Sequence, residues 1–190
     1  MNVAVNESMT NVVFSEKFAE FEWLTKGITA KSLQFGNEGH STGEKPIDYQ
    51  DRLGAIAAMK SQLAKSVTSL IIYDGKSETD YRYVQSHLAL IMSTNAMLDK
   101  RKEPEKVSIE EMSLMIARMV IDFALNPELE NNFTARGRLY YAGIRTWQMT
   151  DENYRKTWKP YEKLMVLSLE SAIAEASKAI QDYKKKTYKK

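Results

Sequence analysis

Apolar residues recur every three or four positions along most of this 190-residue chain, the spacing of helices that bury one face. A short stretch from Phe14 to Leu24 predicts a short amphipathic helix. The longer stretches cover 49–73, 79–98, 108–125 and 161 to about 184. We find no strand-like alternation, no repeat and no sustained heptad pattern in the sequence. The pattern therefore predicts an all-α fold.

The predicted buried faces of these helices consist mainly of leucine, isoleucine, valine and methionine. In chain order they are Leu53, Ile56, Ala57, Met59, Leu63, Val67 and Leu70; Tyr83, Val84, Leu88, Ile91 and Met92; Met112, Met115, Ile116, Met119, Val120 and Phe123; and Leu164, Leu167, Ala172, Ile173, Ala176 and Ile180. The methionines are more simply core-filling residues than part of a cofactor site. His87 is expected to be a partly buried member of the second set.

Polar and helix-breaking residues separate these segments. Gly75 lies in a predicted turn. Ser108 and Glu111 match a capping box, in which the serine oxygen accepts a backbone N–H at the helix start. Pro127 ends the same helix, because the residue before a proline disfavours helical backbone. The stretch 27–46, rich in glycine, asparagine, serine and threonine, predicts a mobile linker.

The sequence predicts that the chain has three parts. Residues 1–47 form a mobile segment with a short amphipathic helix and the linker. Residues 48–133 form a helical body. Residues 134–190 form a helix-turn-helix region, a long C-terminal helix that packs on the body, and a basic tail.

The helix-turn-helix prediction begins with a short helix over 134–145. Leu139, Tyr140 and Ile144 are expected to face inward, and Arg136, Arg138 and Arg145 to be available outward. A tight connection follows, and Thr150 is expected to cap a second helix.

Pro160 sets the predicted end of that second helix. Proline is disfavoured inside a helix but suits the first turn of a new one, so the second helix is expected to end near Trp158-Lys159. The long helix then begins at Tyr161. A helix, a short turn and a second helix form a helix-turn-helix motif. In DNA-binding proteins with this motif, the second helix enters the major groove.

Composition narrows the possible functions. The chain is 43% apolar and 27% charged, as in globular proteins, and has no cysteine, which excludes disulfides and thiolate zinc sites. His40 and His87 are far apart, so neither a metal site nor a histidine-based triad is expected. The sequence has no glycine-rich phosphate loop and no supported carboxylate pair. We therefore expect no enzyme activity, no cofactor and no small-molecule substrate.

Apolar runs are too short for a membrane span of about 18 residues, and the N-terminus lacks the pattern of a secretory signal. We expect no membrane association and a location in the cytoplasm.

Charge is distributed unevenly along the chain. Residues 134–190 hold 13 Lys/Arg against 6 Asp/Glu, a net of +7, whereas residues 1–133 hold 14 against 19, a net of −5. A basic C-terminal third behind an acidic body suggests that one end faces a polyanion. A solvated lysine tail accounts for part of the difference, because 184–186 and 189–190 are all lysine.

The predicted second helix carries residue types that bind DNA. Arginine can bond guanine edges through two hydrogen bonds, and asparagine can pair with adenine or bond a phosphate. Phosphate contacts give affinity rather than sequence choice. The candidate DNA-binding residues are Arg155, Lys156, Lys159 and Asn153 on the second helix, and Arg136, Arg138, Lys163, Gln148 and Thr150 around it. Trp158 and Tyr161 are most simply core anchors. A helical hairpin with a solvated basic face is the structural alternative.

The run LYYAGIRTWQMTDENYRKTWKPYEKLMVLSLESAIAEA (139–175) resembles the C-terminal helix-turn-helix region of the phage lambda Q-type late-gene transcription antitermination proteins. The likeness covers the threonine before the second helix, the aromatic residue four positions on, the T-x-K-P sequence and the following helix. Weaker likeness extends from Asp48 to Ile180. The lambda member of the family carries a cysteine-rich zinc-binding insertion before the helix-turn-helix, whereas this chain has only NPELENNF (126–133), so the resemblance does not imply zinc.

The resemblance implies a protein of the host bacterial cytoplasm that binds double-stranded DNA beside a phage late promoter and engages host RNA polymerase at a promoter-proximal pause. It then stays on the enzyme, narrows the RNA exit channel and suppresses terminators. Two other classes remain open. One is a helix-turn-helix repressor or activator acting on initiation, and the other is a helical phage inhibitor or structural protein that does not bind DNA.

Overall fold

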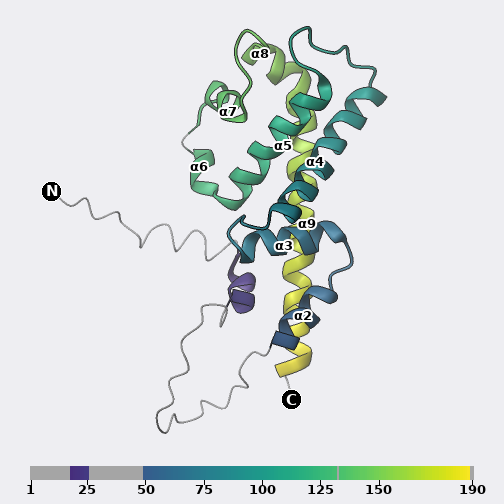
Figure 1. The fold of residues 1–190 in the computed structure, drawn as a ribbon, viewed down its shortest axis with the longest axis vertical. Coiled ribbons are helices and arrows are strands. Elements are labelled where there is room, and N and C mark those ends of the chain that lie inside the picture. The colour runs from purple at the N-terminus through teal and green to yellow at the C-terminus, as the bar shows by residue number, and fades with distance from the viewer. Residues whose placement is uncertain (1–17, 26–48, 132, 189–190) are drawn as a thin grey trace, which may run out of the picture.

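The computed structural model describes residues 18–25, 49–131 and 133–188, and every regular element in these ranges is helical (Figure 1). The all-α prediction is confirmed. The predicted N-terminal helix is present over 18–25, where Phe18 and Leu24 are buried. Phe14, His40 and the predicted linker lie outside the described residues.

A single long helix forms the axis of the molecule (Figure 1). α8 (Asp151–Asn153), the π-helical turn η1 (Tyr154–Trp158) and α9 (Lys159–Tyr188) follow one another without a gap. α4 (Glu78–Leu98) and α5 (Ile109–Leu125) lie along the half of α9 nearer to α8. α2 (Tyr49–Ala57) and α3 (Gln62–Ile72) lie along the other half. α6 (Pro127–Asn131) and α7 (Ala135–Ala142) connect α5 to α8.

Local sequence signals explain where several helices begin. The hydroxyl oxygens of Ser61, Ser108, Thr134 and Thr150 each accept the backbone N–H of the residue three positions later. Each bond satisfies one of the N–H groups that a helix start leaves without a partner inside the helix. The predicted caps at Ser108 and Thr150 are confirmed.

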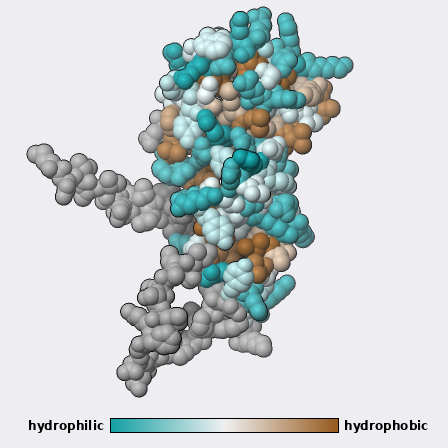
Figure 2. All heavy atoms as spheres, in the orientation of Figure 1, coloured by the Kyte–Doolittle hydropathy of each residue, from teal (hydrophilic) through white to brown (hydrophobic). Residues whose placement is uncertain are grey.

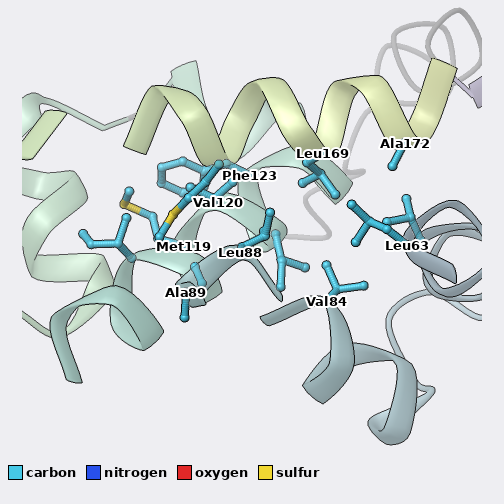
Figure 3. Packing of buried hydrophobic residues seen from close by; sticks show 14 of the residues in the cluster. Leu63, Val84, Leu88, Ala89, Met119, Val120, Phe123, Leu169 and Ala172 are labelled. Carbon is cyan, nitrogen blue, oxygen red and sulfur yellow. The ribbon is translucent and has the colours of Figure 1, made fainter. Parts of the chain in front are cut away.

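The helices enclose one hydrophobic core, which extends from Ile144 and Met149 at the α7–α8 end to the helix 18–25 and Ile180 toward the other end (Figure 1). Figure 3 shows Leu63 of α3, Leu88 of α4 and Phe123 of α5 converging beneath Leu169 and Ala172 of α9. The methionines predicted to fill the core do so, since Met92, Met112 and Met119 have no exposed surface. Across the described residues, we find no helix with both the length and the apolar character needed to span a bilayer.

The predicted single helix over 49–73 is wrong, because α2 and α3 are separate helices with a break at 58–61. The carboxylate of Glu175, on α9, accepts hydrogen bonds at this break. One oxygen accepts the backbone N–H groups of Lys60 and Ser61 at 2.7 and 2.8 Å, and the other accepts the Ser61 hydroxyl at 2.8 Å. The break is therefore stabilised by a residue more than a hundred positions away.

Some apolar residues predicted to be buried lie at the surface. The exposed ones are Leu53, Ala57, Tyr83, Tyr140, Leu164 and Leu167. In α2 the cause is the close approach of α9: a Cβ on Gly54 would lie 2.7 Å from the ring of Tyr183. Gly54 and Ala55 therefore face the core, and Leu53, about 100° around the helix from Gly54, faces away.

The predicted helix break at Pro160 is also wrong. The backbone N–H of Lys159 donates to the carbonyl of Tyr154, five residues back, which is the hydrogen bond of a π-turn. In a regular α-helix the ring of Pro160 would clash with the carbonyl four residues earlier. The wider turn just before the proline lets the helix continue. The second helix is therefore the first part of one long helix, and a separate short helix is absent from 151–188.

Candidate nucleic-acid interface

The predicted DNA-binding segment lies at one end of the molecule, where α7, the turn 143–149 and α8 meet (Figure 1). Gly143 ends α7 with φ of 97°, a left-handed conformation that glycine adopts without a steric penalty. Ile144 then turns inward and is 2% exposed.

Gln148 and Thr150 hold the turn together. The Gln148 side-chain oxygen accepts the Arg145 backbone N–H at 2.9 Å, and the Arg145 carbonyl accepts the N–H groups of Gln148 and Met149. Thr150 then caps α8 by accepting the Asn153 N–H at 3.3 Å. These contacts give both side chains structural roles beside the supporting DNA contacts that the sequence suggests.

A buried glutamate fixes α7 against the long helix. Glu162 is 2% exposed and accepts three hydrogen bonds. They come from Arg138 at 2.9 Å, Lys159 at 2.6 Å and the Tyr154 hydroxyl at 2.6 Å. A buried carboxylate needs such partners, because its charge is poorly stabilised away from water. Arg138 also lies over the ring of Phe123, 5.2 Å from its centroid.

The expectation that Arg138 faces outward is therefore wrong. Its side chain is 19% exposed, and its guanidinium is bonded to Glu162, which lies 24 positions further along the chain. Lys159 is 32% exposed in its side chain and bonded to the same carboxylate. Arg138 therefore joins α7 to α9, whereas Lys159 pairs with Glu162 within α9.

The phenol of Tyr154 belongs to the same buried cluster. Burial, the adjacent Glu162 carboxylate and the hydrogen bond between them raise the pKa of Tyr154 well above its ordinary value of 10. The hydroxyl therefore remains a donor to Glu162 at neutral pH. Because Tyr154 begins the π-turn, this bond links the irregular turn to the core.

Six of the predicted site residues are exposed: Arg136, Thr150, Asn153, Arg155, Lys156 and Lys163. Within the described part of the chain, the side chains of Arg136, Arg155 and Lys163 form no hydrogen bond or ion pair. Lys156 pairs with Glu152 at 2.6 Å, and both side chains are about two-thirds exposed. Such a pair adds little stability, so a phosphate could replace the glutamate.

The connector between α4 and α5 packs beside this segment. The Tyr161 hydroxyl donates to Asp99 at 2.6 Å and accepts from Arg101 at 2.8 Å. Burial and the bond to Asp99 raise the pKa of Tyr161, while Arg101 opposes the change. Tyr161 is 4% exposed and Trp158 1% exposed, so both are core anchors as predicted.

A pocket of about 590 Å³ lies between this connector and the α8 segment. Its wall includes Arg101, Lys102 and Lys106 from the connector, and Trp147 and Asn153 from the other side. Sequence reasoning missed Trp147 and the connector cations. The sequence feature that could have identified Trp147 is its position in a predicted turn, outside the predicted apolar faces of the helices.

A smaller pocket, of about 220 Å³, lies on the other side of Trp147. Arg136, Tyr140, Arg145 and Asp151 contribute to its wall. The guanidinium of Arg145 lies 4.3 Å from the centroid of the Tyr140 ring. Aromatic and cationic side chains therefore alternate around the turn.

His87 stacks on the ring of Tyr83, with 6.1 Å between centroids, and is partly buried as predicted. Among the described residues, no group of three or more His, Cys, Asp or Glu side chains is placed to hold a metal ion. Comparison of the chain with protein-family models, curated proteins and solved structures finds no match.

Proposed function

We propose that this protein is a DNA-binding transcription antitermination factor, which contacts double-stranded DNA through the α7–α8 end and RNA polymerase through another surface. The observation that carries the proposal is the set of exposed cations at that end. Arg136, Arg155, Lys156 and Lys163 lie in the solvent around a helix–turn–helix order of elements. Cations in this position neutralise phosphates and release counterions.

The exposed residues divide into two roles in this proposal. Arg155 and Asn153, in the first turns of the long helix, contact base edges, because the N-terminal residues of a recognition helix do so in helix-turn-helix proteins. Arg136, Lys156 and Lys163 contact phosphates and set the register of the protein on the duplex. Continuation of the helix into α9 is compatible with these roles, since only its beginning needs to enter the groove.

Arg138 and Lys159 act as positioning residues in the proposal. The contact between Arg138 and Glu162 holds α7 at a fixed angle to the long helix before DNA is bound, and Lys159 pairs with the same carboxylate from within the long helix. A site that is already ordered loses less conformational freedom on binding.

The proposed polymerase contact lies on the outer face of α4. Tyr83, Leu90 and Met97 recur every seven residues on this helix and are 39%, 63% and 56% exposed, and the adjacent Leu98 is 73% exposed. Figure 2 shows apolar atoms gathered on the surface toward the α8 end of the molecule. Exposed apolar residues gathered on one face favour a protein partner.

The proposed sequence of steps during transcription comes from the resemblance to the lambda Q-type proteins. The protein would bind beside a late promoter, join RNA polymerase at a promoter-proximal pause, and remain bound so that terminators are passed. The protein makes and breaks no covalent bond in this scheme.

Single-round transcription with bacterial RNA polymerase tests the proposal. The template carries the DNA that flanks the gene for this protein, followed by an intrinsic terminator. We expect increased read-through, and its loss when the promoter-proximal DNA is replaced by an unrelated sequence.

Two other outcomes would exclude antitermination, and a third would exclude DNA recognition. Altered initiation with unchanged termination would indicate a repressor or activator. If neither initiation nor termination changes and the protein does not bind the duplex, the basic end of this helical protein is only a solvated surface. Read-through on every template would mean that DNA recognition plays no part.

A further inference from the structure

Trp147 is exposed in a way that the core and the proposed duplex contacts do not explain. Its side chain is 69% exposed, whereas the other two tryptophans, Trp23 and Trp158, are 9% and 1% exposed. The neighbouring core positions are already filled by Ile144 and Met149, which are 2% and 3% exposed. A large apolar ring is therefore held in water at the end of the molecule that carries the exposed cations.

The backbone on either side of Trp147 is fixed. The Arg145 carbonyl accepts the N–H groups of Gln148 and Met149 at 2.9 and 3.0 Å, and the Gln148 side chain closes the same turn. Trp147 lies between these bonded residues and lines both pockets, of about 590 and 220 Å³. A ring presented from an ordered turn loses little freedom when a flat ligand stacks on it.

The two pockets beside Trp147 contain groups suited to a nucleotide. The larger pocket has a volume within the range of ligand sites, and Arg101, Lys102 and Lys106 line it. Across the indole, Tyr140 is 65% exposed and carries the guanidinium of Arg145 on its ring. Aromatic faces interspersed with cations are the common feature of sites for single-stranded nucleic acid.

Glutamates moderate the charge of the larger pocket. Glu103 and Glu105 line it together with the three cations, so the five side chains sum to +1. Glu103 is also engaged by the Ile109 backbone N–H at 3.1 Å. Stacking rather than charge must therefore supply most of the affinity, and the dependence on salt should be shallow.

We propose that Trp147 is a stacking platform for an unpaired nucleobase, with Tyr140 and Arg145 holding the neighbouring nucleotide and the connector cations facing the phosphates. Bases inside a duplex are stacked on one another and cannot cover the indole. The proposed ligand therefore differs from the duplex, although Asn153 lines the larger pocket and Arg136 the smaller one. An unpaired base could belong to melted DNA or to RNA, and the two sources are separated by the test.

The test uses the full chain, a 12-nucleotide oligo(dT), an oligo(U) of the same length and a hairpin duplex closed by a non-nucleotide linker, so that the duplex has no unpaired base. We expect the single strands to quench tryptophan fluorescence, because the exposed indole is the one that a base can reach. Trp147→Ala should abolish the quenching and weaken single-strand binding roughly 10- to 100-fold, as for loss of one stacked base. Trp147→Phe should restore part of the affinity. The hairpin duplex should bind wild type and Trp147→Ala equally.

Tyr73→Ala provides the matched control, since Tyr73 is 52% exposed at the far end of α3 and should not alter binding. Stronger binding of oligo(dT) than oligo(U) would identify melted DNA as the source, and the reverse would identify RNA. The inference is overturned if single strands bind Trp147→Ala as tightly as wild type, or if they do not bind while the hairpin duplex does. The second result would leave the proposed function intact. If Trp147→Ala loses RNA polymerase binding but keeps its affinity for single strands, Trp147 is a protein contact instead.

Discussion

The guanidinium of Arg138 in α7 donates to the buried carboxylate of Glu162 in α9 at 2.9 Å. Lys159 and the Tyr154 hydroxyl bind the same carboxylate. This contact joins the two helices that carry the proposed DNA-binding residues. It also explains why two of the predicted DNA-binding cations face inward.

Glu162→Gln should lower the free energy of unfolding by about 3 kcal/mol, because it leaves Arg138 and Lys159 without their charge partner. This value is the lower end of the range for breaking a buried ion pair, because the side chains of Arg138 and Lys159 are 19% and 32% exposed. Urea denaturation measures the change. Glu170→Gln, an exposed position on the same helix, should change stability by about 0.5 kcal/mol or less. Equal stability of the two variants would rule out a structural role for the cluster.

Tyr154→Phe should lower the free energy of unfolding by about 2 kcal/mol at neutral pH, since it removes a buried hydrogen bond to a charged group. The pKa of Tyr154 is raised in the folded state, so its contribution is complete below pH 10 and declines as pH rises further. Denaturation of both proteins at pH 8 and pH 11 should show the difference shrinking. Tyr140→Phe, at a residue that is 65% exposed, is the control and should change stability by about 0.5 kcal/mol or less.

Glu175→Gln should make stability less sensitive to acid. The Ser61 backbone N–H, assisted by the Ser61 hydroxyl and the Lys60 N–H, lowers the pKa of Glu175 below its ordinary value of 4.5. A lowered pKa stabilises the fold above pH 4.5, and this contribution is lost as pH falls through the folded-state value. Thermal unfolding of both proteins from pH 7 to pH 3 should show their stabilities converging. A constant difference across that range would contradict the role of Glu175 at the α2–α3 break.

Trp158→Ala should lower the free energy of unfolding by about 4 kcal/mol, because it empties a fully buried site in the π-turn. Trp147→Ala is its matched control and should change stability by about 0.5 kcal/mol or less. Calorimetry on the two variants checks both values. A large loss with Trp147→Ala would mean that the exposed indole contributes to folding.

Arg155→Ala should weaken binding to the target duplex by about 1–3 kcal/mol and relax the choice of one base, if its guanidinium reads a base edge. Lys163→Ala should weaken binding to every sequence alike and reduce the salt dependence, as expected for a phosphate contact. Lys178→Ala, an exposed position further along α9, is the control. Titrations with target and scrambled duplexes at several salt concentrations separate the three. If Arg155→Ala weakens binding to the target and scrambled duplexes equally, Arg155 contacts a phosphate rather than a base.

Local patterns determined much of the fold. The α4 and α5 segments were predicted nearly to their ends, because apolar spacing and capping by Ser108 act over a few neighbouring residues. The same holds for the cap at Thr150 and for the buried positions of Trp158 and Tyr161. The proposed duplex contacts Arg136, Asn153, Arg155, Lys156 and Lys163 remain predictions from the sequence.

Only the tertiary structure decided the features that depend on distant partners. The break between α2 and α3 is held by Glu175, 114 positions from Ser61, and no local rule connects these residues. Arg138 looked like a surface cation because its partner, Glu162, lies on another helix. The local rule for Pro160 predicted a break, yet the π-turn, with Tyr154 and Trp158 packed in the core, lets one helix continue. Apolar spacing describes one face of one helix, whereas burial and pairing depend on which other helix covers that face.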